Sequence, residues 1–386
     1  MHTLSIDMAE AQFWNNADVD IVLAWIQDLK RVGYKEPKRI LYNNEFSLVE
    51  RQPSALQHGR FVNFIAREQT PPAVYINDGE EDQHNSHISQ IIDFCSSVKN
   101  FSLPPADTIS NTKHKVHSDI LLVITFNFPN WYYQAIPYLE MMHRHFFPNI
   151  VYCGDNQNEF LNATATLKKN MSFIEAPMVR GELGYRCLPL AMDMGYNVSG
   201  FLVISDDIIL NTLRIQNYDK TKFWIDEHGQ YFNCTAGINS WKWWNLNDKM
   251  AYRQVLSVFE SIAKDSILTK YFHTLHINGE HGVDSCLFRS SDIVYVPKSV
   301  KKEVTYLLNL FLKHNVFLEI AVPMALYGVM DKRDILLFKS VCLWGEERSD
   351  PWKYFLPEKI FLHPVKFSNP SNRKPFCEKY LIDFYL

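Results

Sequence analysis

Four runs of large apolar residues between residues 119 and 207 constrain the fold most strongly. They are "DILLVITFNFP" (119–129), "NIVYCGD" (149–155), "MSFIEAP" (171–177) and "SGFLVISDD" (199–207). Near-continuous apolar runs of this length are typical of strands buried on both faces. Stretches with helical character separate them, over 131–146 and 188–197. Alternating strands and helices predict an α/β fold with a mostly parallel sheet flanked by helices.

The 386 residues are enough for one broad α/β domain or for two domains. Around this core the pattern changes, because 101–116 loses its periodicity and contains a Pro-Pro pair, as linkers do. After residue 300 the sequence indicates helices broken at Asn315 and Pro323, followed by an aromatic tail. We therefore expect an N-terminal α/β accessory region, a linker, an α/β core and a C-terminal helical part with a tail (1–100, 101–116, 117–300 and 301–386).

Composition narrows the possible partners. A formal net charge of −4 gives no broad cationic surface, which argues against nucleic acid or anionic membranes as the main partner. We find no run of about 18 apolar residues and no N-terminal signal pattern, so we expect no membrane segment in this chain.

Cysteines and glycosylation motifs bear on the compartment. The seven cysteines are scattered and form no Cys-x-x-Cys pair, which argues against the usual zinc and thioredoxin motifs, and their odd number leaves at least one thiol unpaired. Five Asn-x-Ser/Thr acceptors fit a secretory lumen, although such short motifs also arise by chance. They start at Asn100, Asn162, Asn170, Asn197 and Asn233.

Two adjacent carboxylates, Asp206 and Asp207, follow the last of the four apolar runs. At the end of a buried strand they would repel each other unless a cation or hydrogen-bond donors neutralised them. Carboxylate oxygens are ligands that Mg²⁺ or Mn²⁺ prefers. Alternatively, the pair caps the following turn on the surface.

The segment "GFLVISDDIILN", preceded by "GELGYR", resembles the region around the Asp-x-Asp motif of nucleotide-sugar glycosyltransferases of the GT-A fold, exostosin-like or STELLO-like. The resemblance spans roughly residues 119–297. Ser205 stands where the strict motif has its first aspartate.

This resemblance implies roles for individual residues. Asp207 and a late histidine would bind Mn²⁺ or Mg²⁺, and Asp206 would face the sugar nucleotide. Further residues would contact the nucleotide or its diphosphate: Thr125, Asn127, Asp155 and Lys366. The histidine is His363, although "FLHPVKFS" is also compatible with a structural His-Pro turn.

Two loops carry further polar candidates. In "RGELGYR", Arg180 and Arg186 flank two glycines ahead of a helix, so guanidinium and backbone N–H groups could bind a diphosphate; a plain turn is the alternative. In "HINGEHGVDSCLF", Glu280 and Asp284 are candidates for the base that an inverting transferase needs.

Three tryptophans in "NSWKWWNLND" could bind a sugar ring or fill the core.

The leading hypothesis is thus a metal-dependent glycosyltransferase that moves a sugar from a nucleoside diphosphate sugar to a hydroxyl of a glycan or glycoprotein. It would act in the Golgi lumen if an upstream signal or anchor is missing, and otherwise in the cytoplasm. Two alternatives stay open: a glycosyltransferase-shaped protein that binds glycans or a partner without turnover, and a metal-dependent phosphoesterase.

Overall fold

The structure is a computed structural model. It describes residues 115–127, 131–167, 171–234, 250–265, 268–279 and 285–381, together with 60–63 and a few residues between 90 and 98. Most of the predicted accessory region and almost all of the predicted linker lie outside the described residues. The chain divides into two compact units. One contains 59–227, 292–299 and 337–386; the other contains 228–291 and 300–336.

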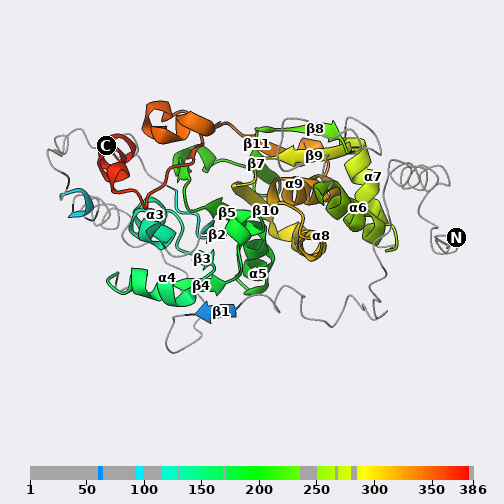
Figure 1. Cartoon of the computed structure of the whole chain (residues 1–386), viewed down its shortest axis with the longest axis horizontal. Coiled ribbons are helices and arrows are strands. Elements are labelled where there is room, and N and C mark those ends of the chain that lie inside the picture. Colours follow the sequence, from blue (N-terminus) through cyan, green and yellow to red (C-terminus); the bar gives the residue numbers. More distant parts are fainter. Residues whose placement is uncertain are drawn as a thin grey trace. The chain divides into compact units, whose positions relative to one another are not determined.

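Parallel strands form the centre of an eight-stranded sheet in the first unit (Figure 1). In sheet order they are β4 (Ser172–Glu175), β3 (Ile150–Gly154), β2 (Ile120–Thr125) and β5 (Gly200–Ser205). Every residue of β2, β3 and β5 is buried, as the apolar runs predict. The four predicted strands and the mixed α/β fold class are confirmed. Because parallel strands end at one edge, the polar residues that follow β2, β3 and β5 gather there.

Antiparallel strands complete this sheet. β1 pairs with β4 at one end, and β10 pairs with β5 and β7 on the other side. The order then ends with β11. Their bounds are β1 Arg60–Asn63, β10 Ile293–Pro297, β7 Phe223–Asp226 and β11 Ile335–Phe338.

The helices of this unit follow its strands. The segment 131–146 forms a 3-10 turn and then α3, and 187–193 forms α5, with Pro189 in its first turn as expected. The bounds are α3 Ile136–His143, α4 Gln157–Thr164 and α5 Cys187–Asp193, with α10 Arg373–Pro375 and a π-helix Phe376–Leu381 near the C-terminus.

A small three-stranded sheet brings the C-terminal tail to the end of β5. Its strands are β12 (Ser340–Cys342), β13 (Phe361–His363) and β6 (Ile209–Leu210), in that order. β6 begins just after the Asp206–Asp207 pair, and β13 lies antiparallel to it. Residues more than 150 positions apart in the sequence therefore meet at one place.

The second unit is mainly helical and has a two-stranded antiparallel sheet, β8 (Gly229–Asn233) with β9 (Ser285–Arg289). Its helices are α6 Met250–Ile262, α7 Thr269–Asn278, α8 Lys301–Lys313 and α9 Leu318–Val329. The predicted break near Asn315 is confirmed, since this residue lies between α8 and α9 with φ 52°. The predicted break at Pro323 is wrong. Pro323 lies inside α9, where the residues around it are buried, and this packing outweighs the loss of one N–H donor.

Three disulfides link six of the seven cysteines: Cys95–Cys377, Cys153–Cys187 and Cys234–Cys286. Cys342 is buried and unpaired, in agreement with the odd count. Such bonds are typical of oxidising compartments.

The glycine-rich turn ahead of α5 packs tightly on the residue that follows β2. Gly181 has φ +86°, and a Cβ atom there would lie 2.9 Å from Oδ1 of Asn127. A Cβ on Gly184 would lie 3.7 Å from the same oxygen. The glycines of "RGELGYR" thus allow a close approach between this turn and Asn127.

Two buried histidines contact the same aromatic ring, that of Phe147. His117 stacks on Phe147 with centroids 5.1 Å apart, and His143 lies edge-on to the same ring at 6.4 Å. Both side chains are inaccessible to solvent, and their ring nitrogens make no hydrogen bond within the described part of the chain. Burial lowers the pKa of His117 from 6.5 to about 4 and that of His143 to about 3.

We expect the protein to lose stability in mild acid because of these histidines. Both are neutral in the folded chain, whereas the unfolded chain takes up protons below its pKa of 6.5. The stabilisation is therefore complete above that pH and falls as the pH drops towards 4, by about 2 kcal/mol per histidine at pH 5. Urea denaturation at pH 8 and pH 5 measures it. His143→Leu should reduce the pH dependence, and the exposed His273→Leu serves as control; equal pH dependence in both variants would contradict this account.

Gly181→Ala should destabilise the protein more than Gly195→Ala. Both glycines have a left-handed φ, +86° and +82°, so alanine costs each about 1 kcal/mol. Only Gly181 also has a neighbour that a Cβ would meet, whereas nothing lies within 4 Å at Gly195. We expect the extra cost to be about 1 kcal/mol or more. Thermal denaturation of the two variants checks the difference, and an equal loss would mean that Asn127 moves aside freely.

Candidate active site

The two aspartates at the end of β5 are buried, not exposed. Asp206 and Asp207 expose only 2% and 1% of their surface, which excludes the surface-turn alternative. Asp206 N donates to the carbonyl oxygen of Thr125 at 2.9 Å, and Oδ1 of Asp206 accepts a hydrogen bond from Asn127 N at 3.2 Å. The end of β2 and the first aspartate thus hold each other in place.

The C-terminal tail supplies two basic side chains to Asp207. Nζ of Lys366 contacts Oδ2 of Asp207, and Nε2 of His363 lies 3.3 Å from Oδ1. The backbone also joins in, since Val365 N donates to the carbonyl oxygen of Asp207 at 2.7 Å. Lys366 lies 4.8 Å from the centre of the Tyr132 ring, in cation–π contact. The structure therefore brings together Asp206, Asp207, His363 and Lys366.

A third carboxylate, Asp292, belongs to this cluster and was missed from the sequence. Its Oδ2 lies 3.6 Å from Nδ1 of His363, and its Oδ1 accepts a hydrogen bond from the Ser205 hydroxyl at 3.0 Å. Asp292 comes directly before β10, which runs antiparallel to β5. That pairing places it opposite Ser205.

Burial and neighbouring charges shift the pKa values of the residues in this cluster in different directions. Burial and then the Asp207 carboxylate raise the pKa of Asp206 to about 7. For Asp207 burial acts in the same direction, but Lys366 and His363 outweigh it and lower its pKa. Burial opposes the charged form of His363, yet Asp292 and Asp207 raise its pKa well above 6.5. Asp207 is thus an anion held between two cationic side chains.

The donor atoms around Asp207 suit a hard divalent cation. Within the described residues, Oδ1 of Asp207 makes no regular hydrogen bond, and it lies 3.3 Å from Nε2 of His363. In an octahedral site with ligand distances near 2.1 Å, neighbouring ligand atoms are about 3 Å apart. A carboxylate oxygen and an imidazole nitrogen are also ligands that Mn²⁺ accepts. The residues present therefore fit such a metal, with the proton of Nε2 leaving as it binds.

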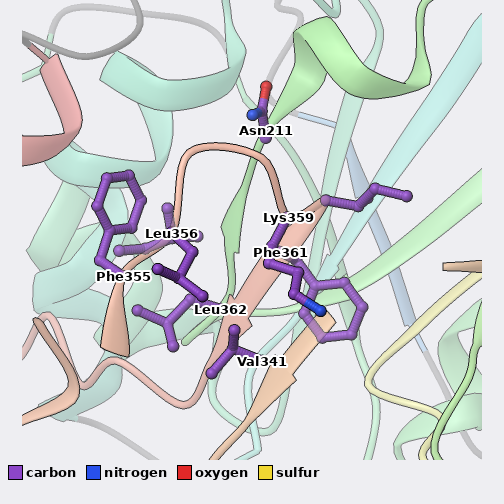
Figure 2. Close-up of a pocket in the computed structure, with 9 residues that line it drawn as sticks. Asn211, Val341, Phe355, Leu356, Lys359, Phe361 and Leu362 are labelled. Atoms are coloured by element: carbon purple, nitrogen blue, oxygen red, sulfur yellow. The ribbon is translucent and has the colours of Figure 1, made fainter. Parts of the chain in front are cut away.

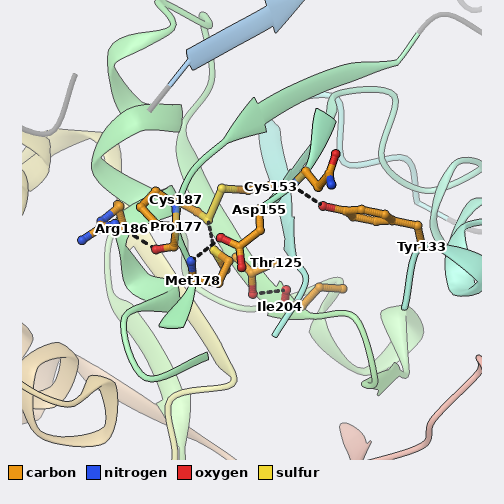
Figure 3. Close-up of a disulfide and its surroundings, with 10 residues drawn as sticks. Thr125, Tyr133, Cys153, Asp155, Pro177, Met178, Arg186, Cys187 and Ile204 are labelled. Atoms are coloured by element: carbon orange, nitrogen blue, oxygen red, sulfur yellow. Dashed lines mark hydrogen bonds between the residues drawn. A yellow bond between two sulfur atoms is a disulfide. The ribbon is translucent and has the colours of Figure 1, made fainter. Parts of the chain in front are cut away.

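Asp155 and Arg186 meet at a second cluster beyond β3 (Figure 3). Oδ1 of Asp155 accepts a hydrogen bond from Met178 N at 2.6 Å, and Nη1 of Arg186 donates to the carbonyl oxygen of Pro177 at 2.8 Å. The Cys153–Cys187 disulfide lies between them and ties the end of β3 to the start of α5. Arg186 is buried, so it stabilises the turn from within.

The other predicted residues either make contacts within the sheet or lie outside the described residues. The hydroxyl of Thr125 donates to the carbonyl oxygen of Ile204 at 3.1 Å, which ties β2 to β5. The Arg180 side chain and the candidate bases Glu280 and Asp284 lie outside the described residues, as do the three clustered tryptophans.

A small pocket lies on the three-stranded sheet next to this site (Figure 2). Its cavity volume is about 10 Å³, and it is lined mainly by apolar residues, among them Val341, Phe355 and Leu362. Ligand pockets usually have 300–1,000 Å³. This pocket is therefore too small for a sugar nucleotide.

None of the helices in the described part of the chain has both the length and the apolar character needed to cross a bilayer.

Comparison with known proteins gives consistent relatives. Two curated proteins of Arabidopsis thaliana, "Probable glycosyltransferase STELLO2" and "Probable glycosyltransferase STELLO1", are each 23% identical to this chain over 83% of its length. The chain spans about a third of their length, 36% and 35%. A solved structure, the mannosyltransferase Ktr4p from S. cerevisiae, matches 68% of this chain and 80% of its own at 10% identity and a TM-score of 0.31.

The family model of the STELLO glycosyltransferases matches residues 1–274, which is more than half of the chain. The matched part includes the parallel strands β2 to β5 and the Asp206–Asp207 pair, whereas Asp292, His363 and Lys366 lie beyond it. The chain belongs to the family of STELLO glycosyltransferases.

Proposed function

We propose that this chain is a metal-dependent glycosyltransferase that moves a sugar from a nucleoside diphosphate sugar to a hydroxyl of a glycan or glycoprotein. The observation that carries the proposal is the contact of Asp207 with both His363 and Lys366 at the end of β5. In a chain of this family, the cluster combines the ligands of a divalent cation with a basic side chain for a diphosphate.

Asp207 and His363 are the proposed ligands of Mn²⁺ or Mg²⁺. When bound, the cation would stabilise the negative charge that develops on the departing diphosphate. The backbone N of Asn127 holds Asp206 in a fixed orientation. We propose that this carboxylate faces the sugar nucleotide.

Lys366 is the residue best placed to meet the diphosphate itself. Its side chain is 40% exposed, whereas that of Asp207 is only 2% exposed, so part of the lysine side chain is open to a ligand. A lysine supplies a compact positive charge to phosphate oxygens. We infer that Lys366 stabilises the leaving group together with the cation.

The remaining roles follow the same plan. Thr125, Asn127 and Asp155 mark the strand ends that would surround the nucleotide, and Arg180 and Arg186 provide positive charge at the glycine turn. For an inverting reaction, the acceptor hydroxyl would lose its proton to Glu280 or Asp284.

We also propose a place of action in the secretory lumen, in the Golgi. The three disulfides support an oxidising compartment. The five glycosylation motifs fit the same location.

One observation favours a second candidate function, binding of glycans or a partner without turnover. Ser205 replaces the first carboxylate of the strict Asp-x-Asp motif, and its hydroxyl is directed at Asp292. Glycan binding unaffected by metal would support this candidate.

Thermal shift with nucleoside diphosphates tests the proposal. With Mn²⁺ and nucleotide at about 100-fold above Kd, we expect the wild type to gain about 5 °C in Tm. Asp207→Asn should lose the part of this shift that requires Mn²⁺, because it removes the anionic ligand. Lys366→Gln should weaken nucleotide binding with and without the metal, because it removes the charge that meets the diphosphate.

Asp219→Asn is the matched control, since this carboxylate lies on an exposed part of the same unit and bonds only locally to Thr221. It should behave as the wild type. The proposal fails if no nucleoside diphosphate stabilises the wild type in the presence of Mn²⁺.

A further inference from the structure

Ser205 occupies a motif position at which a carboxylate is expected, and the structure shows what it does there. Its backbone N donates to the carbonyl oxygen of Asp292 at 2.8 Å, and its hydroxyl donates to Oδ1 of Asp292 at 3.0 Å. Ser205 is buried, with 3% of its surface exposed. The two hydrogen-bond donors of Ser205, its backbone N–H and its hydroxyl, therefore both bind Asp292, one at the backbone and one at the side chain.

The other oxygen of Asp292 faces the proposed metal ligand. Oδ2 lies 3.6 Å from Nδ1 of His363, while Nε2 of the same ring lies 3.3 Å from Oδ1 of Asp207. The two ring nitrogens thus have different neighbours, a carboxylate outside the proposed metal site and a carboxylate within it. The Asp292 side chain is 14% exposed, so its interaction with the ring is largely shielded from water.

We infer that Ser205 and Asp292 form a positioning pair for His363. Asp292 fixes the orientation of the ring from the Nδ1 side, so that Nε2 is directed at Oδ1 of Asp207, where the proposed cation would bind. Ser205 in turn fixes the rotamer of Asp292. This inference rests on the proposed function, and neither residue touches substrate.

The arrangement explains why this chain has serine at the motif position. An aspartate at 205 would place a second carboxylate against Oδ1 of Asp292, within about 3 Å, and like charges at that distance repel strongly. A hydroxyl instead donates a hydrogen bond to Asp292.

Binding of Mn²⁺ alone, without nucleotide, tests the inference. Electron paramagnetic resonance of free Mn²⁺ gives Kd for the full chain and its variants. Loss of a carboxylate behind a metal-binding histidine typically weakens metal affinity 10–100-fold, and we expect this for Asp292→Ala. Asp292→Asn keeps an acceptor oxygen but no charge, so it should restore part of the affinity.

Asp119→Ala is the control. Its carboxylate also forms an ion pair in the same unit, with Nζ of Lys220 at 2.6 Å, and its side chain is 42% exposed. Within the described residues it has no recorded contact with the cluster. It should lower Tm and leave the Mn²⁺ affinity unchanged. A merely structural role of Asp292 would give the same result as Asp119→Ala, with no rescue by asparagine.

If Asp292→Ala binds Mn²⁺ as the wild type does, the positioning pair is refuted while the proposed function stands. If the wild type does not bind Mn²⁺ in the absence of nucleotide, the positioning pair is refuted, while the proposed function is decided separately by the thermal shift with nucleoside diphosphates. Should Asp292→Ala fail to fold, Ser205→Ala carries the test, with a several-fold weaker affinity expected and an unchanged affinity counting against the inference.

Discussion

The ionised carboxylate of Asp207 is the constraint on which the site depends. A charge that is 1–2% exposed is costly unless opposite charges compensate it. The compensation comes from His363 and Lys366, which belong to the far end of the chain. The short strand β13 exists at this place because it pairs with β6 and so carries both side chains to Asp207. The parallel sheet places the Asp207 carboxylate at the end of β5. The three-stranded sheet brings to it the two side chains that neutralise its charge.

Apolar patterning was sufficient to predict the centre of the fold. Strands β2, β3, β4 and β5 are buried runs, and their ends carry Asn127, Asp155 and Asp206, as parallel topology requires. Patterning failed where pairing between distant segments decides the outcome. Pro323 stays within α9 because the helix is packed on all sides, which local propensity does not reveal.

Asp292 could not be identified for a related reason. In the sequence it sits in "RSSDIVY", an ordinary turn before an apolar strand. Its meeting with Ser205 follows from the antiparallel register of β10 on β5, in which Ile293 lies opposite Ile204. Only a prediction of that register would have exposed it. The disulfide partners were likewise undetermined, because connectivity depends on tertiary contacts and not on spacing.

The position of His363 and Lys366 in the tail has a consequence for how the protein comes to be active. The parallel strands and the buried aspartates come well before the tail in the sequence. A chain cleaved ahead of β13 would therefore keep the Asp207 carboxylate and lose its two cationic partners, His363 and Lys366. Cys377, beyond those residues, is bonded to Cys95 across a separation of 282 positions. This disulfide thus links the tail covalently to a segment that precedes the parallel strands β2 to β5. Loss of the bond would free the part of the chain that carries His363 and Lys366, the two side chains that neutralise Asp207.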